Sequence, residues 1–158
     1  MNSPDFFGKY LEEYSIGQIF KHWPGKTVTE GDNNLFCLLT MNHHPIHLDS
    51  HYAARSQHGR PLVVGTYVFS LVVGLTVRDI SGKAIANLEY ESIIHHAPVF
   101  IGDTLYAETE IIDVKKSRTK LDRGIIYVET SAFNQKGIKV LSFRRKVLIP
   151  TKGGEKCD

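Results

Sequence analysis

The chain has 158 residues, which is long enough for one domain with its own hydrophobic core, and we expect residues 1–158 to form a single domain. Its composition, 42% hydrophobic and 23% charged residues, is typical of a soluble globular protein. The formal net charge of +2 is too small to predict binding to nucleic acid or to an anionic membrane, so neither partner is expected.

The sequence contains only two cysteines. Cys37 lies in the apolar run LFCLL, whereas Cys157 lies in a polar stretch, so we expect no disulfide between them and a reducing compartment. The first twenty residues carry too many charges for a secretory signal. The longest apolar stretch, 62–77, is interrupted by Gly, Ser and Thr and is too short to span a bilayer. We therefore expect a cytoplasmic protein.

Two short helices are predicted in the first half of the chain. Residues 33–40 (NNLFCLLT) place leucines at helical spacing, and either Thr29 or Asp32 can cap the start of this helix. Residues 50–57 (SHYAARSQ) follow Asp49, another residue type that caps helices, and the HGRP sequence after them predicts a break.

A long helix is predicted over residues 65–81 (GTYVFSLVVGLTVRDIS). This segment is apolar on nearly every face, which is typical of a buried helix. Its small residues Gly65, Ser70 and Gly74 indicate close packing against a flat surface. Apart from these helices, we expect the chain up to about Gly82 to be irregular.

The second half of the chain predicts β-strands, because apolar and polar residues alternate and β-branched and aromatic residues are frequent. The predicted strand segments are 84–100, 103–117, 124–133 and 138–150. Residues 134–137 (NQKG) predict a hairpin turn, in which Gly137 supplies a positive φ. A long helix with adjacent antiparallel strands indicates an α+β fold with a sheet wrapped around the helix. Long strands also leave sheet edges that a partner would cover, so we expect an oligomer.

Three histidines gather in the sequence TMNHHPIHLD, at His43, His44 and His47. His43 and His47 have the i, i+4 spacing of a zinc-binding helix. However, Pro45 lies between them and disfavours a helical conformation at His44, so the pair is not expected to share one helix face. No cluster of cysteines or carboxylates elsewhere offers further ligands. We therefore predict no metal site.

Acid–base chemistry requires only one imidazole, because its ordinary pKa of about 6.5 lies close to neutral pH. Asn42 and His47 flank a turn that contains Pro45, so both side chains could converge on one cleft. The alternative is a loop whose polar groups only satisfy nearby backbone groups. Gly65 opens the long helix, where free N–H groups could polarise an acyl carbonyl; alternatively it is a glycine required only for packing.

Four segments in order resemble the MaoC-like hydratases of the hotdog fold, which include the R-specific enoyl-CoA hydratases. They are PIHLD (45–49), HGRPLVVGT (58–66), the long helix, and PVFIGDTLYAETEI (98–111). The resemblance implies an antiparallel sheet around the long helix, assembled as a homodimer or as a double-hotdog unit. It also implies a hydro-lyase that reversibly adds water to a 2-enoyl-CoA thioester, and no separate cofactor, since CoA is part of the substrate.

The resemblance implies roles for individual residues. The acid–base histidine of the family falls on His47, and the glycine whose N–H faces the thioester oxygen falls on Gly65. We expect these two residues and Asn42 to be catalytic. We expect the acyl-CoA substrate to be bound by Arg60, Thr66 and His44. Arg144 and Lys115 are further candidates for the CoA phosphates on charge alone.

One catalytic position departs from the family pattern. The family's aspartate falls on Asn42, and the family's asparagine falls on His44. An asparagine can hold a water molecule through its carbonyl oxygen but cannot accept its proton. The form TMNxHPxH resembles the subset that handles branched or dicarboxylic substrates, such as mesaconyl- or itaconyl-CoA hydratases.

Two alternative functions remain open. Thioesterases of the hotdog superfamily carry a carboxylate on the central helix, but this sequence has none there before Asp79, at the far end. A catalytically silent acyl-CoA-binding protein is the other alternative, in which Asn42 in place of aspartate marks the loss of chemistry.

Overall fold

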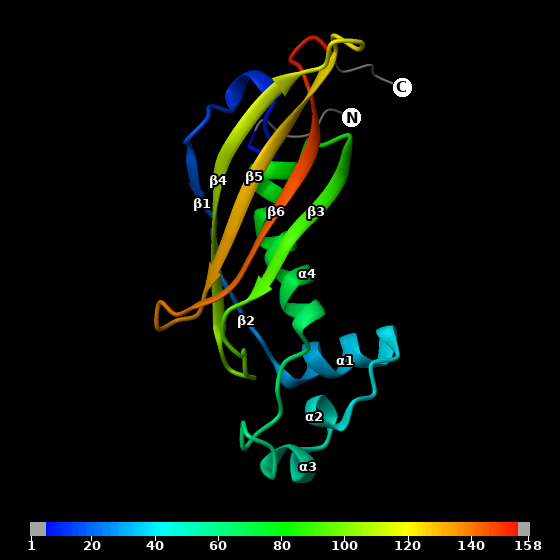
Figure 1. Cartoon of the computed structure of the whole chain (residues 1–158), viewed down its shortest axis with the longest axis vertical. Coiled ribbons are helices and arrows are strands. Elements are labelled where there is room, and N and C mark those ends of the chain that lie inside the picture. Colours follow the sequence, from blue (N-terminus) through cyan, green and yellow to red (C-terminus); the bar gives the residue numbers. More distant parts are fainter. Residues whose placement is uncertain (1–5, 155–158) are drawn as a thin grey trace.

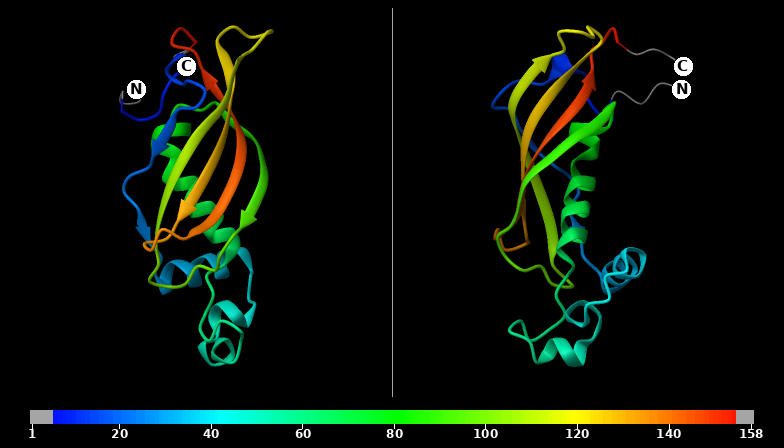
Figure 2. Two further views of the ribbon diagram at one scale, coloured as in Figure 1. Left: turned by 60° about the vertical axis from the view of Figure 1, so that its left-hand side comes forward. Right: turned by 45° about the vertical axis from the view of Figure 1, so that its right-hand side comes forward.

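The computed structural model describes residues 6–154. A six-stranded sheet curves around one side of a long helix, α4 (Gly65–Thr76), as Figures 1 and 2 show. Neighbouring strands pair antiparallel in the order β1-β4-β5-β6-β3, and β2 pairs separately with β4. The strands are β1 (Ile19–Lys21), β2 (Lys26–Thr27), β3 (Ala86–His95), β4 (Thr104–Lys116), β5 (Arg123–Phe133) and β6 (Lys139–Pro150). The predicted α+β fold is confirmed.

Three short helices gather beyond one end of the sheet, next to the first turn of α4 (Figure 1). They are α1 (Glu30–Thr40), α2 (Pro45–Leu48) and α3 (Ser50–Ala54). A 3-10 turn, η1 (Leu11–Glu13), lies near the other end, and α4 continues into a π-helical turn, η2 (Val77–Ser81). No helix within residues 6–154 is long and apolar enough to cross a membrane.

The predicted helix caps are present. Thr29 and Asp32 form a reciprocal capping box at the start of α1, in which each side chain accepts a hydrogen bond from the backbone N–H of the other. The Asp49 carboxylate accepts a hydrogen bond from Tyr52 N at 2.9 Å and so caps α3, which ends at Ala54, earlier than predicted. The capping residues were therefore predicted better than the helix lengths.

The four predicted strands are confirmed, and so is the turn at 134–137, where Gly137 has φ +74°. The prediction of no strands in the first half of the chain was wrong, because β1 and β2 pair with β4. These strands have three and two residues. Such short segments carry too little alternation to be recognised, and only pairing with β4 makes them strands.

Helix α4 packs on the sheet through one face. Its buried residues are Val68, Val72 and Thr76, and the two valines lie in a core that includes Leu105 and Phe143 of the sheet. The prediction that the helix is buried on nearly every face was wrong for this chain, because a stripe of small residues is exposed: Thr66, Ser70 and Gly74. The sheet covers only one side of α4, and branched residues, rather than the small ones, contact it.

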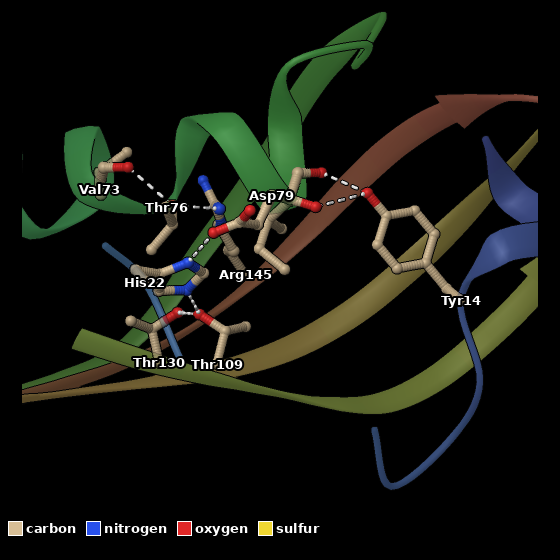
Figure 3. Close-up of polar contacts among 9 residues, drawn as sticks. Tyr14, His22, Val73, Thr76, Asp79, Thr109, Thr130 and Arg145 are labelled. Atoms are coloured by element: carbon tan, nitrogen blue, oxygen red, sulfur yellow. Dashed lines mark hydrogen bonds and ion pairs between the residues drawn. The ribbon is translucent and has the colours of Figure 1, made fainter. Parts of the chain in front are cut away.

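A buried polar network fixes the C-terminal end of α4 to the sheet (Figure 3). Arg145 of β6 is fully buried, and its Nη2 donates a hydrogen bond to Thr76 Oγ1 at 2.7 Å. His22 lies between Asp79 and Thr109: its Nδ1 is 2.7 Å from the Asp79 carboxylate and its Nε2 is 2.8 Å from Thr109 Oγ1. Burial lowers the pKa of His22, although Asp79 acts in the opposite direction.

Only one of the two cysteines lies within the described residues. Cys37 is fully buried and is a free thiol, as its apolar surroundings in the sequence predicted. Burial raises the pKa of this thiol, which makes it unreactive. Cys157 lies outside the described residues.

Candidate active site

The histidine-rich segment folds into α2 and the turn before it. Helix α2 begins at Pro45, and His44 before it has an extended conformation (φ −65°, ψ 125°), as the proline predicted. His43 is therefore outside the helix that carries His47. His44 Nδ1 accepts a hydrogen bond from Ile46 N at 3.1 Å, so His44 caps the helix. This structural role was not predicted for His44, which we had expected to bind substrate.

His47 is oriented by a backbone carbonyl. Its Nδ1 lies 2.7 Å from the carbonyl oxygen of Leu62. Since a carbonyl oxygen can only accept a hydrogen bond, Nδ1 carries the proton. In the neutral ring, Nε2 then bears the lone pair and can accept a proton from water. The ring is half-buried, so it remains accessible to a small ligand.

Asn33 ties the segment of His47 to the start of α4. This side chain of α1 is fully buried. Its Nδ2 donates a hydrogen bond to the His47 carbonyl oxygen at 3.1 Å, and its Oδ1 accepts one from Val64 N at 3.0 Å. Asn33 was predicted only as a helical residue. Its neighbours Asp32 and Asn34 are also polar, so nothing in the sequence indicated that Asn33 is buried.

Gly65 is the first residue of α4. Val64 before it offers no side-chain cap, so no side chain at the N-cap position blocks the N–H groups of the first turn. A Cβ atom at Gly65 would lie 3.1 Å from the His95 ring, which is tighter than ordinary contact. Both interpretations of Gly65 therefore stand, since it opens a helix and also allows close packing.

A cavity of about 280 Å³ lies at this point. Its lining residues are His58, Leu62, Val63, Gly65, Val68, His95, His96, Ala97, Pro98 and Val99. Leu62 connects the cavity to His47, because its carbonyl oxygen accepts the His47 hydrogen bond. His58 lies in the predicted HGRP break, and no role was predicted for His95 or His96. The pair is far from Gly65 in the sequence, and only the fold brings it there.

Asn42 and His47 are not joined by a hydrogen bond in the described part of the chain. The Asn42 Oδ1 atom lies 3.5 Å from His44 N, so it makes at most a weak local contact. Such a contact is expected if this segment is a loop whose polar groups only satisfy nearby backbone groups. A catalytic role for Asn42 stays a prediction.

The residues expected to bind substrate lie in different parts of the fold. Thr66 is exposed in the first turn of α4. The Arg60 guanidinium stacks 3.7 Å from the centre of the Phe100 ring, which also contacts the His58 ring at the cavity. Two further candidates already pair with carboxylates on the sheet: Lys115 with Asp113, and Arg144 with Glu129.

No group of three or more His, Cys, Asp or Glu side chains that could hold a metal ion is present within residues 6–154. The polar groups at the cavity are imidazoles, backbone N–H groups and one nearby guanidinium. Such groups can donate hydrogen bonds and exchange protons.

Residues 12–132 match the family model described as MaoC like domain. The chain belongs to the MaoC-like domain family. It is 34% identical over 142 residues to mesaconyl-CoA hydratase of Cereibacter sphaeroides, covering 90% of this chain and 41% of that protein. It is 31% identical over 115 residues to the (R)-specific enoyl-CoA hydratase of Aeromonas caviae, covering 73% of this chain and 81% of that protein. The predicted resemblance is thereby confirmed.

The fold is confirmed by a solved structure from Mycobacterium tuberculosis that is described as a double hotdog. This MaoC-like chain is 25% identical to that protein with a TM-score of 0.83, covering 96% of this chain and 47% of the other. The chain therefore spans less than half the length of the mesaconyl-CoA hydratase and of the double-hotdog protein.

Proposed function

We propose that this MaoC-like protein is a hydro-lyase that reversibly adds water to a 2-enoyl-CoA thioester. The observation that carries the proposal is the hydrogen bond from His47 Nδ1 to the carbonyl oxygen of Leu62, because it leaves Nε2 as the proton acceptor and because Leu62 lines the cavity at Gly65. The names of the relatives support branched or dicarboxylic enoyl-CoAs, such as mesaconyl-CoA, as substrates. The reaction needs no separate cofactor, because CoA is part of the substrate.

In the proposed mechanism, His47 Nε2 removes a proton from a water molecule as its oxygen adds to C3 of the enoyl group. The π electrons of the C2–C3 bond shift toward the thioester carbonyl, whose oxygen is polarised by the Gly65 N–H. The imidazolium of His47 then delivers its proton to C2. Asn42 positions the water through its carbonyl oxygen, and Arg60 and Thr66 contact the CoA part of the substrate.

Thioester hydrolysis is the weaker candidate. Helix α4 contains no carboxylate within Gly65–Thr76. The first one along the chain, Asp79, lies beyond its C-terminal end and is engaged by His22. A silent acyl-CoA binder differs from a hydratase only in turnover, and the oriented His47 favours turnover.

We also infer that the protein is a homodimer. Strand β3 lies at an edge of the sheet, and its large apolar side chains are exposed: Leu88 (50%), Tyr90 (38%), Ile93 (43%) and Ile94 (50%). Apolar side chains on an open edge strand favour pairing with another chain. A second copy would supply the second hotdog unit that the double-hotdog protein of Mycobacterium tuberculosis contains within one chain. A cytoplasmic location is proposed from the sequence.

The function is tested with crotonyl-CoA and mesaconyl-CoA, following the enoyl absorbance and free thiol in parallel. Loss of enoyl absorbance without thiol release supports the hydratase. Thiol release supports a thioesterase instead. Binding of either thioester with neither signal supports the silent binder.

A further inference from the structure

The cavity at the start of α4 combines an apolar wall with three imidazoles. Leu62, Val63, Val68 and Val99 form the wall, whereas the ionisable side chains among the described lining residues are histidines: His58, His95 and His96. No described lining residue is acidic. An apolar acyl chain needs no such groups, so their concentration at one cavity requires an explanation.

The three histidines differ in their hydrogen bonds. His96 Nε2 is bonded to Ser142 Oγ at 2.7 Å, and His58 Nε2 lies 3.2 Å from the Gln57 amide nitrogen. Within residues 6–154, no hydrogen bond to the His95 ring is present. Its Cε1–Nε2 edge faces Gly65, where a Cβ atom would approach to 3.1 Å. His95 therefore directs a ring nitrogen without a hydrogen bond toward the first residue of α4, beside the proposed thioester site.

Two charged side chains lie against Phe100 next to the cavity, the cation Arg60 and the carboxylate of Asp103, which accepts a hydrogen bond from Phe100 N at 2.9 Å. The Arg60 guanidinium stacks on Phe100, which also contacts His58, so a permanent cation lies close to the cavity. Desolvation and the neighbouring His96 lower the pKa of His95, so its ring is neutral near pH 7 and can donate one N–H. Such a donor can form a charge-assisted hydrogen bond with a carboxylate.

We propose that His95, together with His58 and His96, binds the free carboxylate of the acyl group, so that the cavity selects dicarboxylic enoyl-CoA substrates. This inference rests on the proposed function. In mesaconyl-CoA the free carboxylate is bonded directly to C3, the carbon that receives the water oxygen. Its binding site must therefore adjoin the catalytic groups, as this cavity adjoins Leu62 and Gly65.

The phosphates of CoA are the other anions that these histidines could bind. Four substrates distinguish the acyl carboxylate from the CoA phosphates. Two are mesaconyl-CoA and 2-methylcrotonyl-CoA, in which a methyl group replaces the free carboxylate. The other two are the pantetheine thioesters of the same acyl groups, which lack the nucleotide phosphates. The variants are His95→Leu, which removes the donor, and His95→Gln, which keeps an N–H donor. His51→Leu, an exposed position on α3, is the matched control.

The expected result is a loss of about 10- to 100-fold in kcat/KM for both mesaconyl thioesters with His95→Leu, which corresponds to one hydrogen bond to a charged group. Both 2-methylcrotonyl thioesters keep their rates, His95→Gln loses less, and His51→Leu loses nothing. An equal loss for all four substrates would overturn the proposal, because it indicates a structural role. A loss confined to the two CoA thioesters would also overturn it and assign the histidines to phosphates.

Titration calorimetry with the same thioesters separates this inference from the proposed function. If the wild-type protein turns over no substrate, the hydratase proposal fails. A preference for binding mesaconyl thioesters that His95→Leu abolishes still supports the carboxylate site in that case. Equal affinities for the mesaconyl and 2-methylcrotonyl thioesters overturn it, whether or not the protein is active.

Discussion

His47 Nδ1 and the carbonyl oxygen of Leu62 are 2.7 Å apart, and Leu62 also lines the cavity at the start of α4. One hydrogen bond therefore fixes both the ring orientation and the tautomer of the histidine. In the neutral ring, Nε2 is then the proton acceptor. Orientation of a neutral imidazole by a fixed backbone acceptor is what a general base requires.

Replacement of His47 by alanine removes this base. We expect His47→Ala to lower kcat/KM for hydration by about 10²- to 10⁴-fold, the usual contribution of general acid–base catalysis. The measurement is loss of the enoyl absorbance of mesaconyl-CoA. His51→Ala, an exposed histidine on α3, serves as the control and keeps its activity. Near-normal hydration by His47→Ala would contradict the mechanism.

Asn42→Asp tests the position at which the chain departs from its family. An aspartate can accept a proton from water, which an asparagine cannot. If Asn42 occupies the catalytic position, the variant hydrates crotonyl-CoA faster than the wild type does, as steady-state kinetics with this simple substrate would reveal. An unchanged rate would show that residue 42 does not act on the water.

Asn33→Asp tests how the site is held together. The new carboxylate can still accept the hydrogen bond from Val64 N, but its other oxygen faces the carbonyl oxygen of His47. We expect a loss of about 1–3 kcal/mol in the free energy of unfolding, measured in urea. Activity falls as well, because the His47 segment is no longer tied to α4.

Asn34→Asp is the matched control for this experiment, since it makes the same change one residue later on α1, at a position that is not fully buried. It keeps both stability and activity. If Asn34→Asp and Asn33→Asp lose activity equally, the added charge on α1, rather than the lost hydrogen bond, is responsible.

The long strands and the helix caps could be predicted from the sequence because their signals are local. Buried and less buried residues alternate over the first eight residues of β4 and throughout β5, and Thr29 and Asp49 cap helices that begin one residue later. β1 and β2 could not be predicted in this way, because pairing with β4 defines them. The exposed stripe on α4 could not be predicted either, because hydrophobicity alone does not reveal which faces of a helix are covered.

The site was predictable only where one segment carries it. His47 and Pro45 lie in one short sequence, and the effect of the proline on the preceding residue follows from sterics. In contrast, His95 meets Gly65 across thirty positions of sequence, and Asn33 reaches both His47 and Val64. Such contacts depend on the packing of β3 and α1 against α4, which no local pattern specifies.

The edge strand β3 provides a test of the proposed homodimer. The double variant Leu88→Glu and Ile94→Glu places two charges on this exposed apolar edge, which disfavours pairing with a second copy. Sedimentation equilibrium is expected to give twice the chain mass of 17.8 kDa for the wild type and the single chain mass for the variant. Leu121→Glu, at an exposed loop position, remains dimeric. A monomeric wild-type protein would refute the proposal.

The buried His22 is expected to make the free energy of unfolding depend on pH. Burial lowers its pKa from the ordinary value of 6.5, so below about pH 6.5 the unfolded chain binds a proton at this residue that the folded chain does not. The contribution of His22 to stability is therefore complete above pH 6.5 and is lost as the pH falls. In the neutral ring, Nδ1 donates to Asp79 and Nε2 accepts from Thr109, so both bonds are made without a charge on the ring.

His22→Gln removes the titration but keeps an amide in the network. At pH 7.5 we expect this variant to be less stable than the wild type by about 1–3 kcal/mol, measured by urea unfolding, because the amide cannot reproduce both hydrogen bonds. The difference should shrink toward pH 5, where only the wild type loses the His22 contribution. His51→Gln on exposed α3 controls for removal of a histidine. If the difference in the free energy of unfolding between the wild type and His22→Gln stays constant from pH 7.5 to 5, then folding does not lower the pKa of His22.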